Sequence, residues 1–531
     1  MRNWWSVGLG LVLVWGSVVW ADDGHRHGDA KEKLGTVSFP VSCAPEEQKA
    51  VERGIALLHS FWFDEAQKQF EDAVQKDPNC AMAYWAEALG LYRPLAYRPS
   101  DSDMKLGWTL VQKAQTLHPK TQRERDYVNA LAVFYRDDDR EYETRTREYS
   151  ETMEKVYRQH PGDEEAAVLY GLSLLTWEPD EDHPLINPRK AIEILNKEFL
   201  KNPNHPGVAH YLIHAADAPQ LAPLGLTAAR RYAQIAPATP HALHMPSHIF
   251  ARLGLWQDDI QSNLAALEAA RHPVSMHVGG ENQVHSMEFL EYAYLQVGAD
   301  QKAEQMVREQ SAIGYEQVDK NLVDYLDRTR ASSPAMYFLE MRQWKDAAEL
   351  KPDLHAQPFN QAVIYWAHAV AAGHLHNTAD AREAVRQFDA MVEATKKGPQ
   401  AFRAQHLEVK HDEAAAWAAF TENRNDEALR LLKGVADRQD IEGKGEIELP
   451  AREMLADMLL EMGRPQDALV EYEKSLKTDP NRFNGLAGAA KAAEMVHQPG
   501  EAKTYYAQLV KNCDGQRSER MELAHARSFG R

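Results

Sequence analysis

The sequence predicts an all-α protein, an irregular α-solenoid superhelix built from helix-turn-helix repeats. From Ala50 onward, apolar residues recur at three- and four-residue spacing with few β-branched runs, as expected for amphipathic helices. Near the C-terminus Ala468 and Ala502 stand 34 residues apart, as do Tyr472 and Tyr506, which is the period of a two-helix repeat. The chain has 531 residues, more than one compact core usually supports, and a stacked array accounts for that length.

The first element is an export signal. Arg2 precedes an apolar run that ends at Val19-Trp20-Ala21, a small-x-small cleavage pattern followed by acidic sequence. We expect a cleaved signal peptide over 1–21 and a flexible leader over 22–46, with secretion across the inner membrane into the periplasm. An uncleaved anchor is the alternative, because the run is close to the minimum spanning length. We expect no membrane association once the signal has been cleaved.

The repeats begin after the leader. Small, large and helix-ending residues occupy the expected places of one unit at Gly54, Leu57, Ala66, Phe70, Ala73 and Pro78. Weaker copies are centred on Ala191, Ala228, Asp259, Ala303, Ala347, Ala381 and Ala428. We divide the chain into N-terminal repeats (47–175), histidine-rich central repeats (176–310), middle repeats (311–445), and C-terminal repeats with a tail (446–531).

This grammar resembles that of tetratricopeptide repeat (TPR) proteins. The stretches that carry the resemblance include LLHSFWFDEAQKQFEDAV, HPGVAHYLIHAADAP, HALHMPSHIFARLGLW and LPAREMLADMLLEMGRPQDALVEYEKSLKTDPNRF. More narrowly, the chain is similar to a bacterial group, with exported members, that has no assigned activity. The resemblance implies a repeat scaffold whose concave groove is lined by the first helix of each unit.

Charge and cysteines narrow the function classes. Lys and Arg total 60 against 79 Asp and Glu, a formal charge of −19, which argues against nucleic acid or an anionic membrane as the main partner. Cys43 and Cys80 flank the first repeat at ends that an antiparallel helix pair brings together. They are expected either to form a disulfide, which export favours, or to remain two buried thiols.

Nine of the 23 histidines fall within residues 205–285. His210 and His214 are four residues apart, as are His244 and His248, so that each pair shares a helix face and can reach one ion. With Asp259 at place twenty of its unit, His241, His244 and His248 lie at groove places. The neighbouring units put His210 and Asp217, and then His285, Glu288 and Tyr292, at corresponding places.

The candidate metal ligands are His210, His214, His241, His244, His248 and His285. One divalent transition metal, zinc, copper, iron or nickel, suits such a set. A polar, metal-free groove lining is the alternative reading.

The leading functional hypothesis is an exported, monomeric scaffold that binds a protein or peptide in its groove, with Trp85 and Trp366 as aromatic groove residues beside Asp217, Glu288 and Tyr292. The rival is a metalloprotein, either a metal carrier or a metal-dependent hydrolase, centred on the six histidines. No HExxH, GxSxG, P-loop or dinucleotide motif occurs, so nothing in the sequence requires an enzymatic reaction.

Overall fold

The computed structural model describes residues 33–95, 98–136, 139–179, 185–271, 279–318, 322–445 and 447–529. The predicted signal peptide and the first part of the predicted leader lie outside these residues. The described residues form helices joined by turns, with no β-strand among them. Within these ranges, no helix combines the length and the apolar character needed to cross a lipid bilayer.

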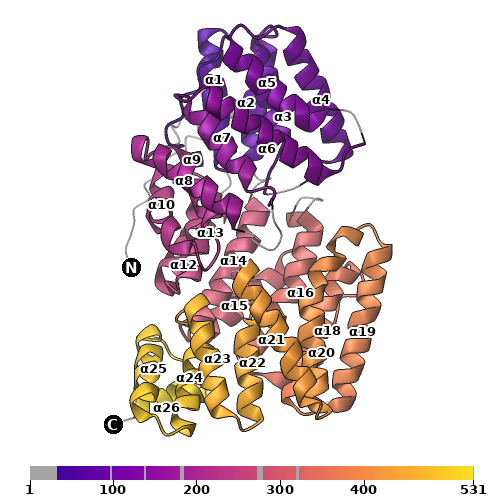
Figure 1. Ribbon diagram of the computed structural model, residues 1–531, viewed down its shortest axis with the longest axis vertical. Helices are drawn as coiled ribbons and strands as arrows, with labels where there is room; N and C mark the ends of the chain where they lie inside the picture. Colours follow the sequence, from indigo (N-terminus) through magenta and orange to yellow (C-terminus); the bar gives the residue numbers. More distant parts are fainter. Residues whose placement is uncertain are drawn as a thin grey trace, which may run out of the picture.

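The helices follow one another in three sections (Figure 1). The N-terminal helices are α1 (Pro45–His59), α2 (Phe63–Lys76), α3 (Ala81–Leu91), α4 (Asp101–Thr116), α5 (Gln122–Tyr135), α6 (Tyr142–Gln159), α7 (Glu164–Leu174) and α8 (Ile186–Lys201). The central helices are α9 (Pro206–Ala215), α10 (Ala222–Ile235), α11 (Pro240–His244), α12 (Pro246–Arg252), α13 (Trp256–Arg271), α14 (Gly279–Gln296), α15 (Asp300–Ala312), α16 (Val323–Glu340) and α17 (Trp344–Glu349). The C-terminal helices are α18 (Pro358–His374), α19 (Thr378–Lys397), α20 (Glu408–Thr421), α21 (Asn425–Glu442), α22 (Ala451–Glu461), α23 (Pro465–Thr478), α24 (Phe483–Met495), α25 (Pro499–Asn512) and α26 (Met521–Ser528).

One turn joins the two helices of many repeats. A residue with positive φ ends the first helix at Phe61, Gly254, Gly298, Arg342, His376, Asn423, Gly463 and His497. In each turn the next N–H reaches the carbonyl five residues back, as Trp62 N–H does with Leu57 O at 3.0 Å, so that the last carbonyls of the helix are satisfied. Five residues after each of these positions stands a fully buried side chain: Ala66, Asp259, Ala303, Ala347, Ala381, Ala428, Ala468 and Ala502. These are the residues that the sequence predicts as repeat markers.

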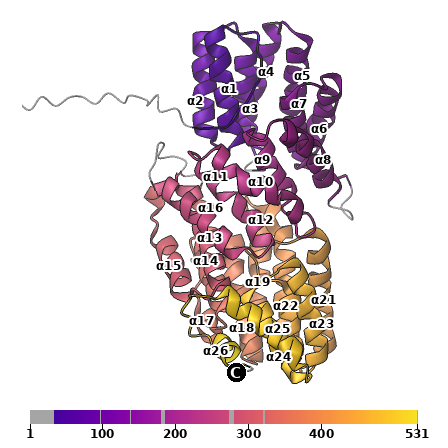
Figure 2. The same ribbon diagram turned by 90° about the vertical axis from the view of Figure 1, so that its left-hand side faces the viewer.

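Consecutive helices pack against one another along the chain, as α1 does with α2, α9 with α10 and α18 with α19. The prediction of an all-α, TPR-like solenoid is therefore confirmed. The N-terminal helices lie at one end of the molecule and the C-terminal helices at the other, with α9–α14 between them (Figures 1 and 2).

The superhelix also joins segments that are far apart in sequence. Trp256 Nε1–H donates to Asn481 O at 2.9 Å, and α14 contacts α24. Beside this contact the buried Arg482 guanidinium donates to Glu340 at 2.6 Å and to Glu453 at 3.0 Å. Because both glutamates are also buried, the three charges form one network that links α16, α22 and the start of α24.

Residues 33–44 belong to the predicted leader, yet they lie in extended form against the first repeats. Phe39 is fully buried and stacks on Trp85, with the ring centroids 5.2 Å apart. At the end of this segment Cys43 and Cys80 are joined by a disulfide, with their Cα atoms 5.0 Å apart. Their Cα separation lies within the range that disulfides normally span.

Candidate metal centre

Four central helices carry the six histidines that the sequence predicts as ligands. α9 supplies His210 and His214, α11 supplies His241 and His244, α12 supplies His248, and α14 supplies His285. Pro246 separates α11 from α12, but Met245 between them keeps right-handed helical angles (φ −51°, ψ −34°). The four-residue spacing therefore still places His244 and His248 on one side, as it would in an unbroken helix.

The structure brings these six residues together in two groups of three, one made of His210, His214 and His241 and the other of His244, His248 and His285. We call them triad A and triad B. In each triad the three candidate ligand atoms lie within 4.8 Å of one another. The sequence analysis expected one ion for the whole set, whereas the geometry separates two sets of ligands.

Triad A converges on the Nε2 atom of His210. This atom lies 3.1 Å from Nε2 of His214 and 3.0 Å from Nε2 of His241. The other ring nitrogen, Nδ1 of His210, is 2.6 Å from the main-chain carbonyl of His59 and must donate to it. Neutral His210 therefore carries its proton on Nδ1 and presents an unprotonated Nε2 to the other two imidazoles.

Triad B shows the same arrangement on two rings. Nδ1 of His244 donates to the side-chain oxygen of Asn263 at 2.6 Å, and the orientation of that amide is set because its NH₂ group donates to Asp259. Nδ1 of His248 donates to Asp217 at 2.9 Å. In their neutral forms both rings are consequently unprotonated at Nε2, although these two Nε2 atoms lie only 3.0 Å apart.

Two facing lone pairs at 3.0 Å repel unless a cation lies between them. Either one ring binds an extra proton or both bind a metal ion. Two imidazole nitrogens that ligate one ion tetrahedrally, each at about 2.0–2.1 Å, are separated by about 3.3 Å, close to the spacings seen here. In triad A, burial lowers the pKa of His210 and of His241 well below the ordinary histidine value, and the neighbouring histidines lower both further. An extra proton is thus disfavoured there.

Outer hydrogen bonds hold the ring of His285 as well. Its Nδ1 lies 2.9 Å from the Tyr325 hydroxyl, which donates in turn to Glu288 at 2.6 Å. Burial alone would raise the pKa of Glu288, but Arg328 and His285 outweigh it and hold that pKa at about 2. Carboxylate or carbonyl partners on the outer nitrogen are typical of metal-bound histidines, because they fix the tautomer and raise the basicity of the ligand.

Each triad is also covered by one phenylalanine ring. Phe61 contacts all three rings of triad A, with centroid distances of 4.4 Å to His210, 5.7 Å to His214 and 5.1 Å to His241. Phe289 does the same in triad B, at 4.9, 4.9 and 5.2 Å from the three rings. The two triads thus repeat one construction of three imidazoles beneath an aromatic ring.

Access from solvent is partial. His210 and His244 are fully buried, whereas the His285 side chain is 30 % exposed and His214 and His241 are half-buried. A small ion or ligand can therefore reach the cluster from the side of these three rings.

A third group, made of His59, Glu165 and His205, also satisfies simple metal-ligand spacing. Here the hydrogen bonds are complete without an ion. Each imidazole donates to one oxygen of Glu165, at 2.9 and 2.8 Å, and accepts on its other nitrogen from the Tyr211 hydroxyl or the Val208 N–H. We interpret this group as a structural network whose His59 carbonyl orients His210.

The residues predicted to line a peptide groove lie elsewhere in the packing. Trp85 is 1 % exposed beneath Phe39, and Trp366 is 4 % exposed with its Nε1–H donated to Glu413 at 2.8 Å. Tyr292 is buried beside Arg482. Asp217 and Glu288 serve as outer partners of His248 and His285. None of these five side chains presents an open surface, and a peptide partner stays a prediction.

Sequence reasoning missed Phe61, Phe289, Asn263 and Tyr325. Asp259 carried a usable signal, because it stands where the other seven units with this turn place alanine. Its carboxyl group is fully buried, and burial raises its pKa well above the ordinary value. Such a costly replacement for alanine marks this repeat as specialised, and its role is to orient Asn263 for His244.

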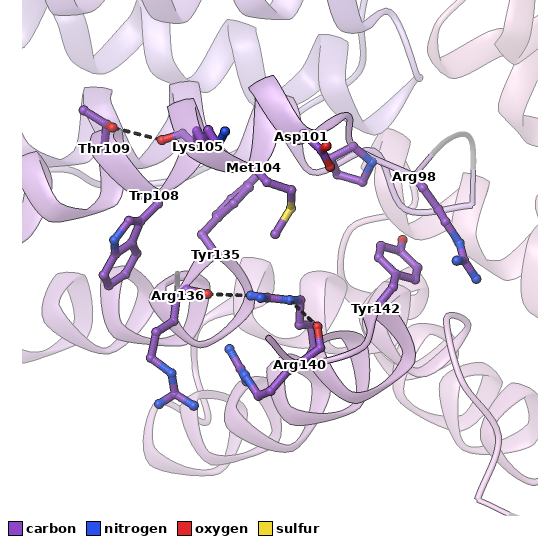
Figure 3. A pocket seen from close by; sticks show the side chains of 12 residues that line it. Arg98, Asp101, Met104, Lys105, Trp108, Thr109, Tyr135, Arg136, Arg140 and Tyr142 are labelled. Atoms are coloured by element: carbon purple, nitrogen blue, oxygen red, sulfur yellow. Dashed lines mark hydrogen bonds between the residues drawn. The ribbon is translucent and has the colours of Figure 1, made fainter. Parts of the chain in front are cut away.

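A cavity of about 550 Å³ lies apart from the histidines, between α4, α5 and the start of α6 (Figure 3). Its lining includes Arg98, Arg136, Arg140 and Arg145. These cations have partners of their own: Arg145 donates to the main-chain carbonyls of Phe134 and Arg136, and Arg140 donates to a glutamate and a main-chain carbonyl. We assign no anion site to it.

Comparison with known proteins adds the following. No family model and no curated protein matches this chain. Among solved structures, human IFIT1 bound to m7Gppp-AAAA is similar, with 12 % identity, a TM-score of 0.35, and coverage of 82 % of this chain and 90 % of that one. The APC/C hetero-tetramer Cut9–Hcn1 gives 11 %, 0.34, and 91 % and 90 %, and the P58(IPK) TPR domain gives 13 %, 0.20, and 91 % and 98 %. These are distant likenesses between helical repeat proteins, and nothing about the function of this chain follows from them.

Proposed function

We propose that this protein is a metalloprotein whose TPR-like scaffold holds transition-metal ions at triads A and B. The observation that carries the proposal is the 3.0 Å separation of the Nε2 atoms of His244 and His248, both of which are unprotonated because their Nδ1 atoms donate outward. The same relation holds around Nε2 of His210 in triad A. A metal ion between these atoms removes the repulsion and uses the lone pairs as ligands.

Three imidazoles per ion are a familiar ligand set for a reactive metal, since they leave a coordination position open. The rigid scaffold supports it, because four helices from three successive repeats position the rings and each of four rings has an outer partner on Nδ1. The protein's residues would thus supply binding, fixed tautomers and shielding by Phe61 and Phe289.

The test is metal binding by the purified protein and two variants. Wild-type protein is stripped with a chelator, titrated with copper and separately with zinc, desalted, and analysed for metal by mass spectrometry. We expect retained metal in the wild type and a loss of at least half in His244→Ala/His248→Ala. His160→Ala is the matched control, because His160 is half-buried and paired with Asp126 outside the cluster. Circular dichroism verifies that each variant is folded. Wild-type protein that retains neither metal would overturn the proposal.

Export is a separate proposal that rests on residues 1–21. It is tested by fractionating bacterial cells that express the full chain: a shortened, periplasmic product is expected, and an unprocessed cytoplasmic one would contradict export.

A further inference from the structure

The two triads lie close enough to act on one ligand. The ring centroids of His241 and His244, one from each triad, are 6.3 Å apart, and those of His214 and His248 are 6.4 Å apart. Within single triads the corresponding distances reach 6.5 Å in A and 5.9 Å in B. The gap between triads is therefore no larger than the spacing within one of them.

The connection between the triads is also short in sequence. α11 carries His241 and His244, so that one helix of five residues contributes a ligand to each triad. Two ions held from one short helix, each with an open position, form a pair rather than two remote sites. In known two-metal centres the ions are about 3.5–4 Å apart and share a bridging ligand.

The charge of the cluster selects among metals. In the described part of the chain, each triad consists of three neutral imidazoles. The nearest carboxylates point to Nδ1 atoms, and each has an arginine beside it: Arg252 lies 2.9 Å from Asp217 and Arg328 lies 3.7 Å from Glu288. A pair of divalent ions would add four charges to this environment, whereas a pair of Cu(I) ions adds two. Burial penalises each uncompensated charge.

Donor type favours the same metal. Imidazole suits copper, and among divalent first-row ions copper binds a given nitrogen site most tightly. A site that accepts both Cu(I) and Cu(II) can exchange electrons with a ligand held between the two ions. Phe61 and Phe289 cover one side of each triad with apolar rings, which limits the access of water.

Building on the proposed function, we infer that triads A and B form one dinuclear copper centre that binds dioxygen between its ions. The step balances within the centre: each Cu(I) gives one electron to the same O₂ molecule, which is held as a doubly reduced dianion by two Cu(II) ions. No proton or atom leaves, and release of O₂ returns both electrons to the metals.

The experiment loads the purified protein with two equivalents of Cu(I) without air and then admits oxygen. We expect two coppers per chain by mass spectrometry, uptake of one O₂ per two coppers by an oxygen electrode, and an electron paramagnetic resonance signal far below the total copper, because bridged Cu(II) ions couple their spins. His285→Ala removes one ligand of triad B; with one copper retained after desalting, its full spin should become visible. His160→Ala should behave as the wild type.

The outcomes separate the two proposals. Two coppers per chain with a spin count equal to the copper content would overturn the dinuclear centre while leaving the metalloprotein proposal intact. The same holds for a single copper per chain, or for two coppers without oxygen uptake. Absence of both copper and zinc from the wild-type protein would overturn both.

Discussion

Replacing Asp217 by asparagine should weaken metal binding at triad B while leaving the fold intact. The carboxylate accepts the Nδ1 proton of His248 at 2.9 Å and the Nε proton of Arg252 at 2.9 Å. Asparagine keeps the size and one acceptor but removes the charge that makes His248 a stronger base. Loss of such an outer partner typically costs 10- to 100-fold in metal affinity, about 1.4–2.7 kcal/mol of binding free energy.

The assay is competition for Cu(I) between the protein and a coloured chelator of known affinity. Asp126→Asn is the matched control, because Asp126 accepts from His160 at 2.8 Å, a bond of nearly the same length at a distance from the cluster. The affinity should fall in Asp217→Asn and be unchanged in the control. Equal affinities in wild type and Asp217→Asn, with both proteins folded, would refute the view that the outer shell tunes the ligands.

Three further predictions concern stability. Burial raises the pKa of Glu413 to about 7, so that between pH 4.5 and 7 the folded protein keeps a proton that the unfolded chain has lost, and this group makes the free energy of unfolding fall by about 3 kcal/mol as pH rises through that window. Glu413→Gln, which keeps an acceptor for Trp366, should remove this part of the pH dependence in urea unfolding at pH 5 and pH 8; an identical slope in both proteins would contradict it. Arg482→Met leaves two buried glutamates unpaired and should cost about 3–5 kcal/mol in denaturant unfolding, whereas a cost below 1 kcal/mol would show that the network is not stabilising. Reduction of the Cys43–Cys80 bond, which closes a loop with a sequence separation of 37, should cost about 4 kcal/mol by the chain-entropy relation; equal melting temperatures with and without reductant would count against this.

The repeat architecture could be predicted because its signals are local. Ala468 and Ala502 mark units by their spacing in sequence, and the structure places both at the same buried position after the same turn. The histidine cluster was also within reach, since repeat phasing alone aims His210, His241 and His285 at one region. The sequence nevertheless expected one ion, because phasing orders helices along the superhelix and does not fix the distances between rings.

What could not be predicted depends on contacts between distant segments. Phe61 covers triad A only because α1 packs against α9, and no local pattern connects a residue near position 60 with one near 210. The assignment of Trp85 to a groove could not anticipate that Phe39 lies on it. Residues of the predicted leader provide that cover, and their composition alone resembles that of a flexible tail.

The measurement that tests the metal centre most directly is anomalous X-ray diffraction from crystals of copper-loaded protein at the copper absorption edge. We predict two anomalous peaks inside the central repeats, each about 2.0–2.1 Å from the Nε2 atoms of one triad. Absence of anomalous density at both triads in crystals that contain copper elsewhere would contradict the metal centre.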